Sequence, residues 1–272
     1  SIAPQLSLVI GALKSALERA CSNPANPRYN HYLFDSIACL VKVLGPMSVE
    51  MLSKLEELLF GTFQIILAND IVEFGPYVLQ ILAQMLSLHL KQHEKPLPNE
   101  YTILLPALLT PTLWDRSGYI PGMVQYLDSF IRKNVSVILS SNQLIPILGI
   151  FQKLIASKAH DHYGLSLISA LVQCVPLDTM KPYLIDILKV LVIRLQTGKT
   201  VKYTQKLLCF LSIFVVHYGT EVLASSLDSI QPQLLLLIIQ QVWIKDVVSI
   251  GNFIDRKCCA IGSASLLTSK IF

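Results

Sequence analysis

Apolar side chains recur along residues 48–67 at the spacing of one helix face, with intervals of 3, 4, 4 and 3 residues. The apolar positions are Leu52, Leu55, Leu59, Phe63 and Ile66. The opposite face carries Glu50, Lys54, Glu57, Gly61 and Gln64. This pattern predicts an amphipathic helix with one buried and one exposed face.

The next segment, residues 76–91, is apolar at nearly every position, so the helix it predicts must be covered on most of its circumference. No stretch of the chain sustains an apolar–polar alternation with period two. No Asn-Gly or Asp-Gly pair marks a hairpin either. The sequence therefore predicts an all-α fold.

Prolines followed by apolar helical runs punctuate the chain at intervals of 30, 40, 36 and 50 residues, on average 39. They are Pro76, Pro106, Pro146, Pro182 and Pro232. Proline is tolerated at a helix start, and helix-pair repeats of the HEAT kind have periods of roughly 40–47 residues. We therefore expect residues 1–272 to form one continuous HEAT-repeat α-solenoid of about six to seven antiparallel helix pairs. A single large helical bundle is the alternative.

Composition narrows the class of protein further. Apolar residues make up 53% and charged residues 15%, against about 25% charged in an average domain. Disorder is excluded by this balance. The mean hydropathy is +0.54, yet the uncharged stretches 134–152 and 207–220 lack the roughly 18 unbroken apolar residues of a spanning helix. We expect a soluble protein without membrane insertion.

The charge distribution and the cysteine spacing argue against a nucleic-acid-binding protein and against a disulfide-stabilised protein. Residues 1–136 have a net charge of −1 and residues 137–272 one of +5, too mild a balance for a dedicated nucleic-acid binder. The six cysteines form no C-x-x-C pair, which favours buried free thiols in a reducing compartment. The chain begins without Met and stops in mid-pattern at Ile271 and Phe272, so we expect a fragment of a longer chain.

Candidate chemistry is sparse. His160, Asp161 and His162 resemble a metal-ligand cluster, but they lie in a polar break where we expect a surface loop without further zinc ligands. Cys258 and Cys259 favour a role in the core. No phosphate-binding loop, G-x-S-x-G or H-E-x-x-H motif occurs. We predict no catalytic residue, no cofactor and no metal site, and hence no enzyme.

Five segments resemble the exportin-2 (CAS) family of nuclear transport receptors, in order and in spacing. They read NHYLFDSI at residues 30–37, FGTFQIILANDIVEFGPYVLQ at 60–80, TPTLWDRSGYIPGMVQYLDSFI at 110–131, ILGIFQKLIASKAHDHYG at 147–164 and RLQTGKTVKYTQK at 194–206. The resemblance implies the middle-to-C-terminal part of a long HEAT-repeat superhelix, without that family's N-terminal Ran-binding repeats or its last repeats.

The same resemblance implies the partners. The parent protein would bind importin-α together with RanGTP in the nucleus and contact nuclear pore proteins as it crosses the pore. In the cytoplasm it would release both partners when Ran hydrolyses its GTP. Because the nucleotide chemistry belongs to Ran, the chain would need no catalytic residue of its own. A HEAT-repeat scaffold for protein assembly, unrelated to transport, is the alternative that the sequence leaves open.

Two places are candidates for partner binding. The first is Trp114 with Asp115 and Arg116, which follow an apolar run and precede Gly118. They form either a partner-contacting corner or a structural turn in which Trp114 closes the core and the charged pair ties the turn.

The second candidate is the basic stretch at residues 181–206, which has six basic residues against the single acid Asp186. We expect a helix to end near Gln196 and a second helix to begin around Lys199. Its candidate partner-binding residues are Arg194, Lys199, Lys202 and Lys206. They form either a solvated polar face or a one-signed patch that steers an acidic partner surface.

Overall fold

The computed structural model describes residues 3–22, 25–90 and 96–269 of the 272-residue chain. Every secondary-structure element within these ranges is helical, which confirms the all-α prediction. The chain divides into two compact units, Ser1–Lys133 and Asn134–Phe272. The boundary falls within helix α6 (Ile120–Ser140), at Asn134, whose backbone angles of φ −141° and ψ 42° are not helical. The single continuous array of six or seven pairs therefore stays a prediction.

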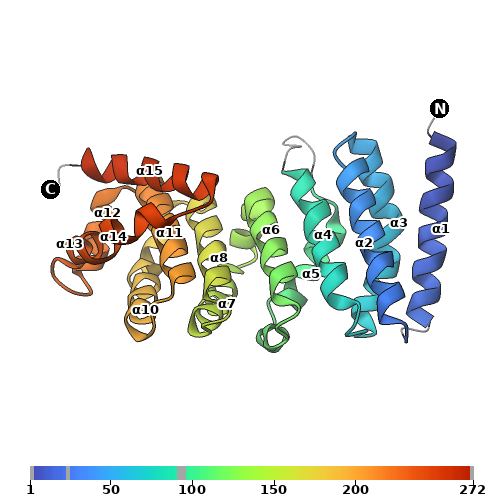
Figure 1. Cartoon of the computed structure of the whole chain (residues 1–272), viewed down its shortest axis with the longest axis horizontal. Coiled ribbons are helices and arrows are strands. Elements are labelled where there is room, and N and C mark those ends of the chain that lie inside the picture. The colour runs from blue at the N-terminus through green and yellow to red at the C-terminus, as the bar shows by residue number, and fades with distance from the viewer. Residues whose placement is uncertain (1–2, 23–24, 91–95, 270–272) are drawn as a thin grey trace. The chain divides into compact units, whose positions relative to one another are not determined.

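Unit 1 is a row of helices that pack side by side (Figure 1). Its elements are α1 (Ala3–Ser22), α2 (Pro27–Leu44), α3 (Val49–Ala68), α4 (Gly75–His89), α5 (Asn99–Leu108), the 3-10 helix η1 (Pro111–Asp115) and the first part of α6. Helix α3 is the amphipathic helix that the sequence predicts: all five residues of its apolar stripe are buried and all five of its polar stripe are exposed. Ser48 caps this helix by accepting a hydrogen bond from the Met51 backbone N–H at 3.1 Å.

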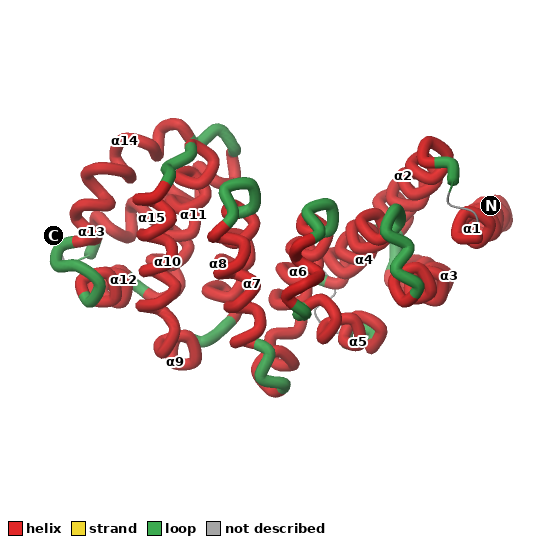
Figure 2. The backbone as a smooth tube through the Cα atoms, turned by 90° about the horizontal axis from the view of Figure 1, so that it is seen from below, coloured by secondary structure: helices red, strands yellow, loops and turns green. Residues whose placement is uncertain are grey.

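Unit 2 contains α11 as its central helix, in contact with α8 on one side and α15 on the other. Figures 1 and 2 both show α11 beside α8. The main elements are α7 (Leu144–Ala156), α8 (Asp161–Cys174), α10 (Leu184–Thr197), α11 (Val201–Tyr218), α12 (Thr220–Asp228), α13 (Leu234–Ile238) and α15 (Phe253–Leu267). Short pieces complete it: α9 (Leu177–Met180), η2 (Lys181–Tyr183), the π-helix η3 (Ile239–Trp243), α14 (Ile244–Asp246) and η4 (Val247–Ser249).

Four polar side-chain contacts recur at similar sequence separations of 46 to 49 residues. In unit 1, Tyr77 contacts His31 and Arg116 contacts Asp70, each pair 46 residues apart. In unit 2, Lys199 contacts Asp246 across 47 residues and Lys206 contacts Asp255 across 49. These separations match a HEAT-like period. Each of these contacts therefore joins equivalent positions in neighbouring repeats.

The proline pattern holds for four of the five positions. Pro76 and Pro146 lie in the first turns of α4 and α7, while Pro182 and Pro232 precede α10 and α13. Pro106 does not open a helix, as the sequence pattern suggested, but lies inside α5. Proline has no backbone N–H and its ring crowds the preceding turn, and α5 ends two residues later.

Helices α11 and α12 meet at Gly219, where the chain bends by 117°. Gly219 has a φ of 91°, which side-chain-bearing L-residues rarely adopt. Among the helices described, none alone has the length and apolar character needed to cross a membrane, although α11 and α12 together pass that test by length and composition.

Helices α11 and α15 are in close contact where Gly262 meets Ser212. A Cβ atom added at Gly262 would lie 2.6 Å from the Cα atom of Ser212, well inside van der Waals contact. Ser212 is itself fully buried and donates its hydroxyl to the Leu208 carbonyl at 2.8 Å. The α11–α15 contact therefore depends on the absence of a side chain at residue 262.

We predict that Gly262→Ala lowers the free energy of unfolding by about 1–3 kcal/mol, because the new methyl group overpacks the α11–α15 contact. Gly149→Ala, at an exposed position in α7 with no atom within 4 Å, is the matched control and should stabilise by about 0.5–1 kcal/mol. Urea denaturation of both variants measures the difference. Equal effects of the same sign would contradict the close packing at Gly262.

Candidate partner-binding surfaces

The basic stretch folds as a helix, a turn and a second helix, as the sequence predicts. Helix α10 ends at Thr197, Gly198 follows, and the Thr200 hydroxyl caps α11 by accepting from the Tyr203 backbone N–H at 3.2 Å. Because α11 begins at Val201, Lys199 lies in the connection ahead of the helix. The second helix therefore begins two residues later than expected, and Lys199 lies outside it.

Arg194 does not belong to a surface patch, contrary to the expectation from the sequence. Its side chain is buried, and its Nη2 lies 2.6 Å from Asp161 Oδ2. The Nη1 donates to the Gly198 carbonyl at 2.5 Å, and the guanidinium lies over the Tyr203 ring at 5.0 Å from its centroid. Arg194 thus ties the end of α10 to the start of α8 and to the first turns of α11.

Asp161 likewise departs from its predicted place. The sequence suggested a surface loop for residues 160–162, but Asp161 is the first residue of α8 and only 1% exposed. Its carboxylate takes the buried position because Arg194 supplies the compensating charge. Within the described ranges, no three His, Cys, Asp or Glu side chains are grouped so as to hold a metal ion.

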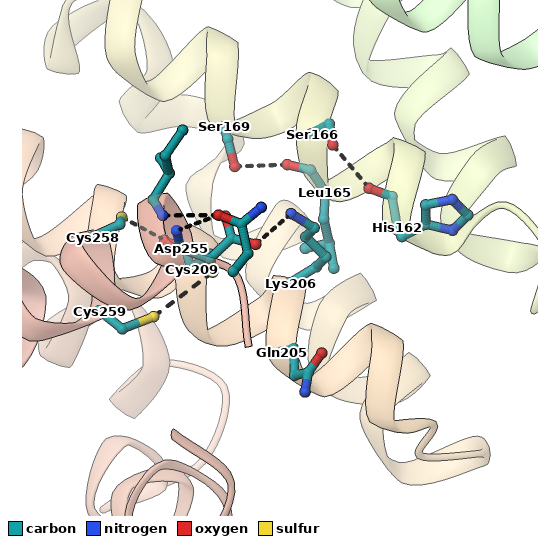
Figure 3. A network of polar contacts seen from close by, with 12 residues as sticks. His162, Leu165, Ser166, Ser169, Gln205, Lys206, Cys209, Asp255, Cys258 and Cys259 are labelled. Carbon is teal, nitrogen blue, oxygen red and sulfur yellow. Dashed lines mark hydrogen bonds and ion pairs between the residues drawn. The ribbon is translucent and has the colours of Figure 1, made fainter. Parts of the chain in front are cut away.

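Lys199 and Lys206 form ion pairs with acidic residues of α14 and α15. Lys199 Nζ lies 2.5 Å from Asp246 Oδ2. Lys206 Nζ lies 2.8 Å from Asp255 Oδ2, and Figure 3 shows this second pair. Gln205 adds a hydrogen bond from its Nε2 to the Ser249 carbonyl at 2.8 Å. These contacts tie α11 to α14, η4 and α15. The stretch is therefore not one-signed in space, contrary to its appearance in the sequence.

Lys202 is the exposed cation of this group for which no hydrogen bond or ion pair is found among the described residues. The positive charge of Lys202 interacts electrostatically with His162, which lies in the first turn of α8. Burial, and then the positive charge of Lys202, lower the pKa of His162 below its usual value. We refer to Lys199, Lys202 and Lys206 as the lysine surface.

Three free thiols lie near this surface, at the contact of α11 with α15 (Figure 3). Cys259 is 1% exposed, and its Sγ lies 3.7 Å from the Sγ of Cys209. Cys258 is half-buried and its Sγ approaches the Cys209 carbonyl at 3.8 Å. The core position expected for the adjacent cysteines is confirmed for Cys259 and holds only in part for Cys258.

In unit 1, the burial of Trp114 fits the structural alternative for this corner. Trp114 lies in η1, is 3% exposed, and donates its Nε1–H to the Leu108 carbonyl at 2.7 Å. Arg116 forms a two-pronged contact with Asp70, at 2.5 and 2.8 Å, and lies over the Tyr119 ring. By donating to Asp70, Arg116 lowers the pKa of that carboxyl.

A cavity of about 370 Å³ opens beside this corner. Asp70, Arg116 and Tyr119 are among its polar lining residues, and apolar side chains of α3, α4, α5 and η1 also line it. Arg116 remains partly exposed, with 39% of its side-chain area accessible. At this corner Arg116 is therefore accessible to solvent, while the buried Trp114 stabilises the turn through its hydrogen bond to the Leu108 carbonyl.

The comparisons with known proteins agree with this architecture. A family model described as "CAS/CSE protein, C-terminus" matches residues 1–271. Exportin-2 from Danio rerio is 35% identical and that from Homo sapiens 34% identical, each over 98% of this chain. A solved structure, "The exportin Cse1 in its cargo-free, cytoplasmic state", superposes with a TM-score of 0.86 at 32% identity, over 98% of this chain and 28% of that one.

Fold and likeness together define an all-α HEAT-repeat solenoid. The chain belongs to the CAS/CSE family, which confirms the resemblance found in the sequence. It spans 27% of the length of the Exportin-2 relatives named above.

We predict that Arg194→Met lowers the free energy of unfolding by about 3–5 kcal/mol, because it leaves the Asp161 carboxylate buried without a counter-charge. Lys189→Met, at an exposed position of the same helix, should change it by no more than about 0.5 kcal/mol. Denaturant unfolding followed by circular dichroism measures both. Similar stabilities of the two variants would show that the buried ion pair does not hold α8 against α10.

Proposed function

We propose that the protein acts as a nuclear export receptor that binds importin-α together with RanGTP in the nucleus and carries importin-α to the cytoplasm. The match of the family model to residues 1–271 carries this proposal. The Exportin-2 relatives support it over nearly the whole of this chain. Such a receptor shuttles through the nuclear pore and contacts nuclear pore proteins on the way.

The receptor works without a reaction of its own. GTP hydrolysis takes place on Ran, so this chain acts by binding and needs neither a catalytic residue nor a cofactor. Importin-α and RanGTP each favour the same curved state of the solenoid, and two ligands that favour one state bind cooperatively. Release follows when Ran hydrolyses its nucleotide and that state loses one of its two ligands.

Contacts between neighbouring repeats are suited to such a change of curvature. The Lys199–Asp246 and Lys206–Asp255 pairs lie at the joint between α11 and the segment from α14 to α15, and all four side chains are partly exposed. Exposed ion pairs contribute little stability, so they can lengthen or exchange partners at small cost. The buried Asp161–Arg194 pair holds α8 and α10 together while the joint moves.

The lysine surface is the part of unit 2 that we propose contacts an acidic partner surface. Lys202 is exposed, and Lys199 keeps 44% of its side-chain area accessible. In unit 1 we propose a partner contact for Arg116, with Trp114 positioning it through the turn. Arg194 contributes by fixing the start of α11 rather than by touching a partner.

A binding assay with purified partners tests the transport role. The full-length parent protein is tagged, immobilised and mixed with importin-α and with Ran loaded with either GTP or GDP. We expect importin-α to be retained with RanGTP and lost with RanGDP, because only the GTP form favours the loaded state. Retention that ignores the nucleotide, or no retention at all, would contradict the export role and leave a HEAT-repeat scaffold.

A second test addresses the lysine surface. We predict that Lys199→Gln with Lys202→Gln slows association with importin-α and RanGTP about fivefold at low ionic strength, with a smaller effect in physiological salt. Lys181→Gln with Lys189→Gln removes the same charge from exposed positions of the same unit and is the control. Association rates of the two double variants are measured by stopped flow. Equal rates for the two double variants would remove the lysine surface from the interface.

A further inference from the structure

Unit 1 contains a second concave site, about 340 Å³ in volume, between α2 and α4 with a contribution from α6. Its lining combines aromatic rings, one carboxylate and several glutamine amides. Among the described residues, no lysine or arginine lines it. The chemistry of this site is thus opposite to that of the lysine surface, and it lies in the half of the sequence that has a net charge of −1.

The aromatic part of the site is held rigidly. Phe34 is 1% exposed, and its ring stacks on that of Tyr77 with centroids 5.0 Å apart and planes 9° from parallel. The Tyr77 hydroxyl lies 3.2 Å from His31 Nδ1, which fixes the position of the exposed imidazole beside it. Aromatic faces carry partial negative charge and attract cations.

The polar part of the site is rich in hydrogen-bond acceptors. Asp35 is exposed, lies one helical turn after His31 on α2, and is the only acidic or basic residue other than His31 in the lining. Gln84 Nε2 donates to the Ala38 carbonyl at 3.1 Å, which directs the donating side of this amide toward α2. The exposed side chains of Gln80 and Gln125 complete the rim.

We propose that this site binds the side chain of an arginine in a basic segment of a partner protein. A guanidinium is planar, stacks on aromatic rings, and can bond a carboxylate with two parallel N–H groups. Asp35 supplies that carboxylate, Tyr77 and His31 the aromatic surface, and the glutamines accept the remaining N–H groups or bond the backbone of the segment. The proposal does not depend on the transport role and concerns a different unit from the lysine surface.

Fluorescence anisotropy with synthetic peptides tests the site on the whole chain. The probe is a fluorescein-labelled decapeptide of alternating glycine and arginine. Its matched twin has citrulline in place of every arginine, which keeps the shape and removes the charge. A third peptide with lysine in place of arginine separates guanidinium recognition from simple charge. We expect the arginine peptide to bind several-fold more tightly than the lysine peptide, and the citrulline peptide not to bind.

Variants place the binding at this site. Asp35→Asn should weaken binding of the arginine peptide about tenfold, because a charge-assisted pair is lost. Tyr77→Leu should weaken it about threefold, whereas Tyr77→Phe keeps the ring and should bind like the unaltered protein. Glu57→Gln removes the same charge from the exposed face of α3, outside the site, and is the control.

Circular dichroism and thermal melting confirm that each variant is folded before its binding is compared. Equal binding of the citrulline peptide would overturn the proposal, as would equal weakening by Asp35→Asn and Glu57→Gln. Equal binding of the lysine and arginine peptides would overturn the assignment of arginine as the ligand. Because these probes contain neither importin-α nor Ran, their outcome is independent of the nucleotide-dependent retention assay.

Discussion

Burial of each helix by its neighbours in adjacent repeats is the constraint on which the rest of this structure depends. Helix α11 is buried because α8 packs on one side of it and α15 on the other. Its contact with α15 is close enough that Gly262 lies against the backbone of Ser212. A stack of this kind has no single central core, so stability and curvature are both set at the joints between neighbours.

Sequence periodicity was sufficient to predict the helices, because an amphipathic helix records its own burial in its spacing. The stripe on α3 is an example: every apolar position that defines it is buried. Glu56 shows the limit of this reasoning. It lies on the buried side of α3, where it is bonded to His89 Nε2 and to the Tyr101 hydroxyl, each at 2.6 Å. Its position four residues after Leu52 was the available signal for burial, but its partners lie 33 and 45 residues away.

The same limit explains why the candidate site was predicted only in part. Spacing along α10 and α11 located the lysines and the turn, because those are local features. It could not supply Asp161, Asp246 and Asp255, which come from 33 to 49 residues away and pair with Arg194, Lys199 and Lys206. A run of like charges in one repeat of a solenoid is therefore weak evidence for a one-signed surface, since neighbouring repeats contribute the counter-charges.

These ion pairs differ in burial, and the difference assigns them different mechanical roles. Asp161 and Arg194 are both nearly inaccessible, so separating them would leave a desolvated charge in the core, and the helices they join must move as one body. Lys199 with Asp246 and Lys206 with Asp255 are open to water, which replaces either partner when the pair separates. The buried pair joins α8 to α10, and the exposed pairs join the start and first turns of α11 to α14 and α15. Contacts of both kinds thus link neighbouring helix pairs. In a solenoid built in this way, small displacements at the exposed pairs change the curvature while the buried pair keeps its packing.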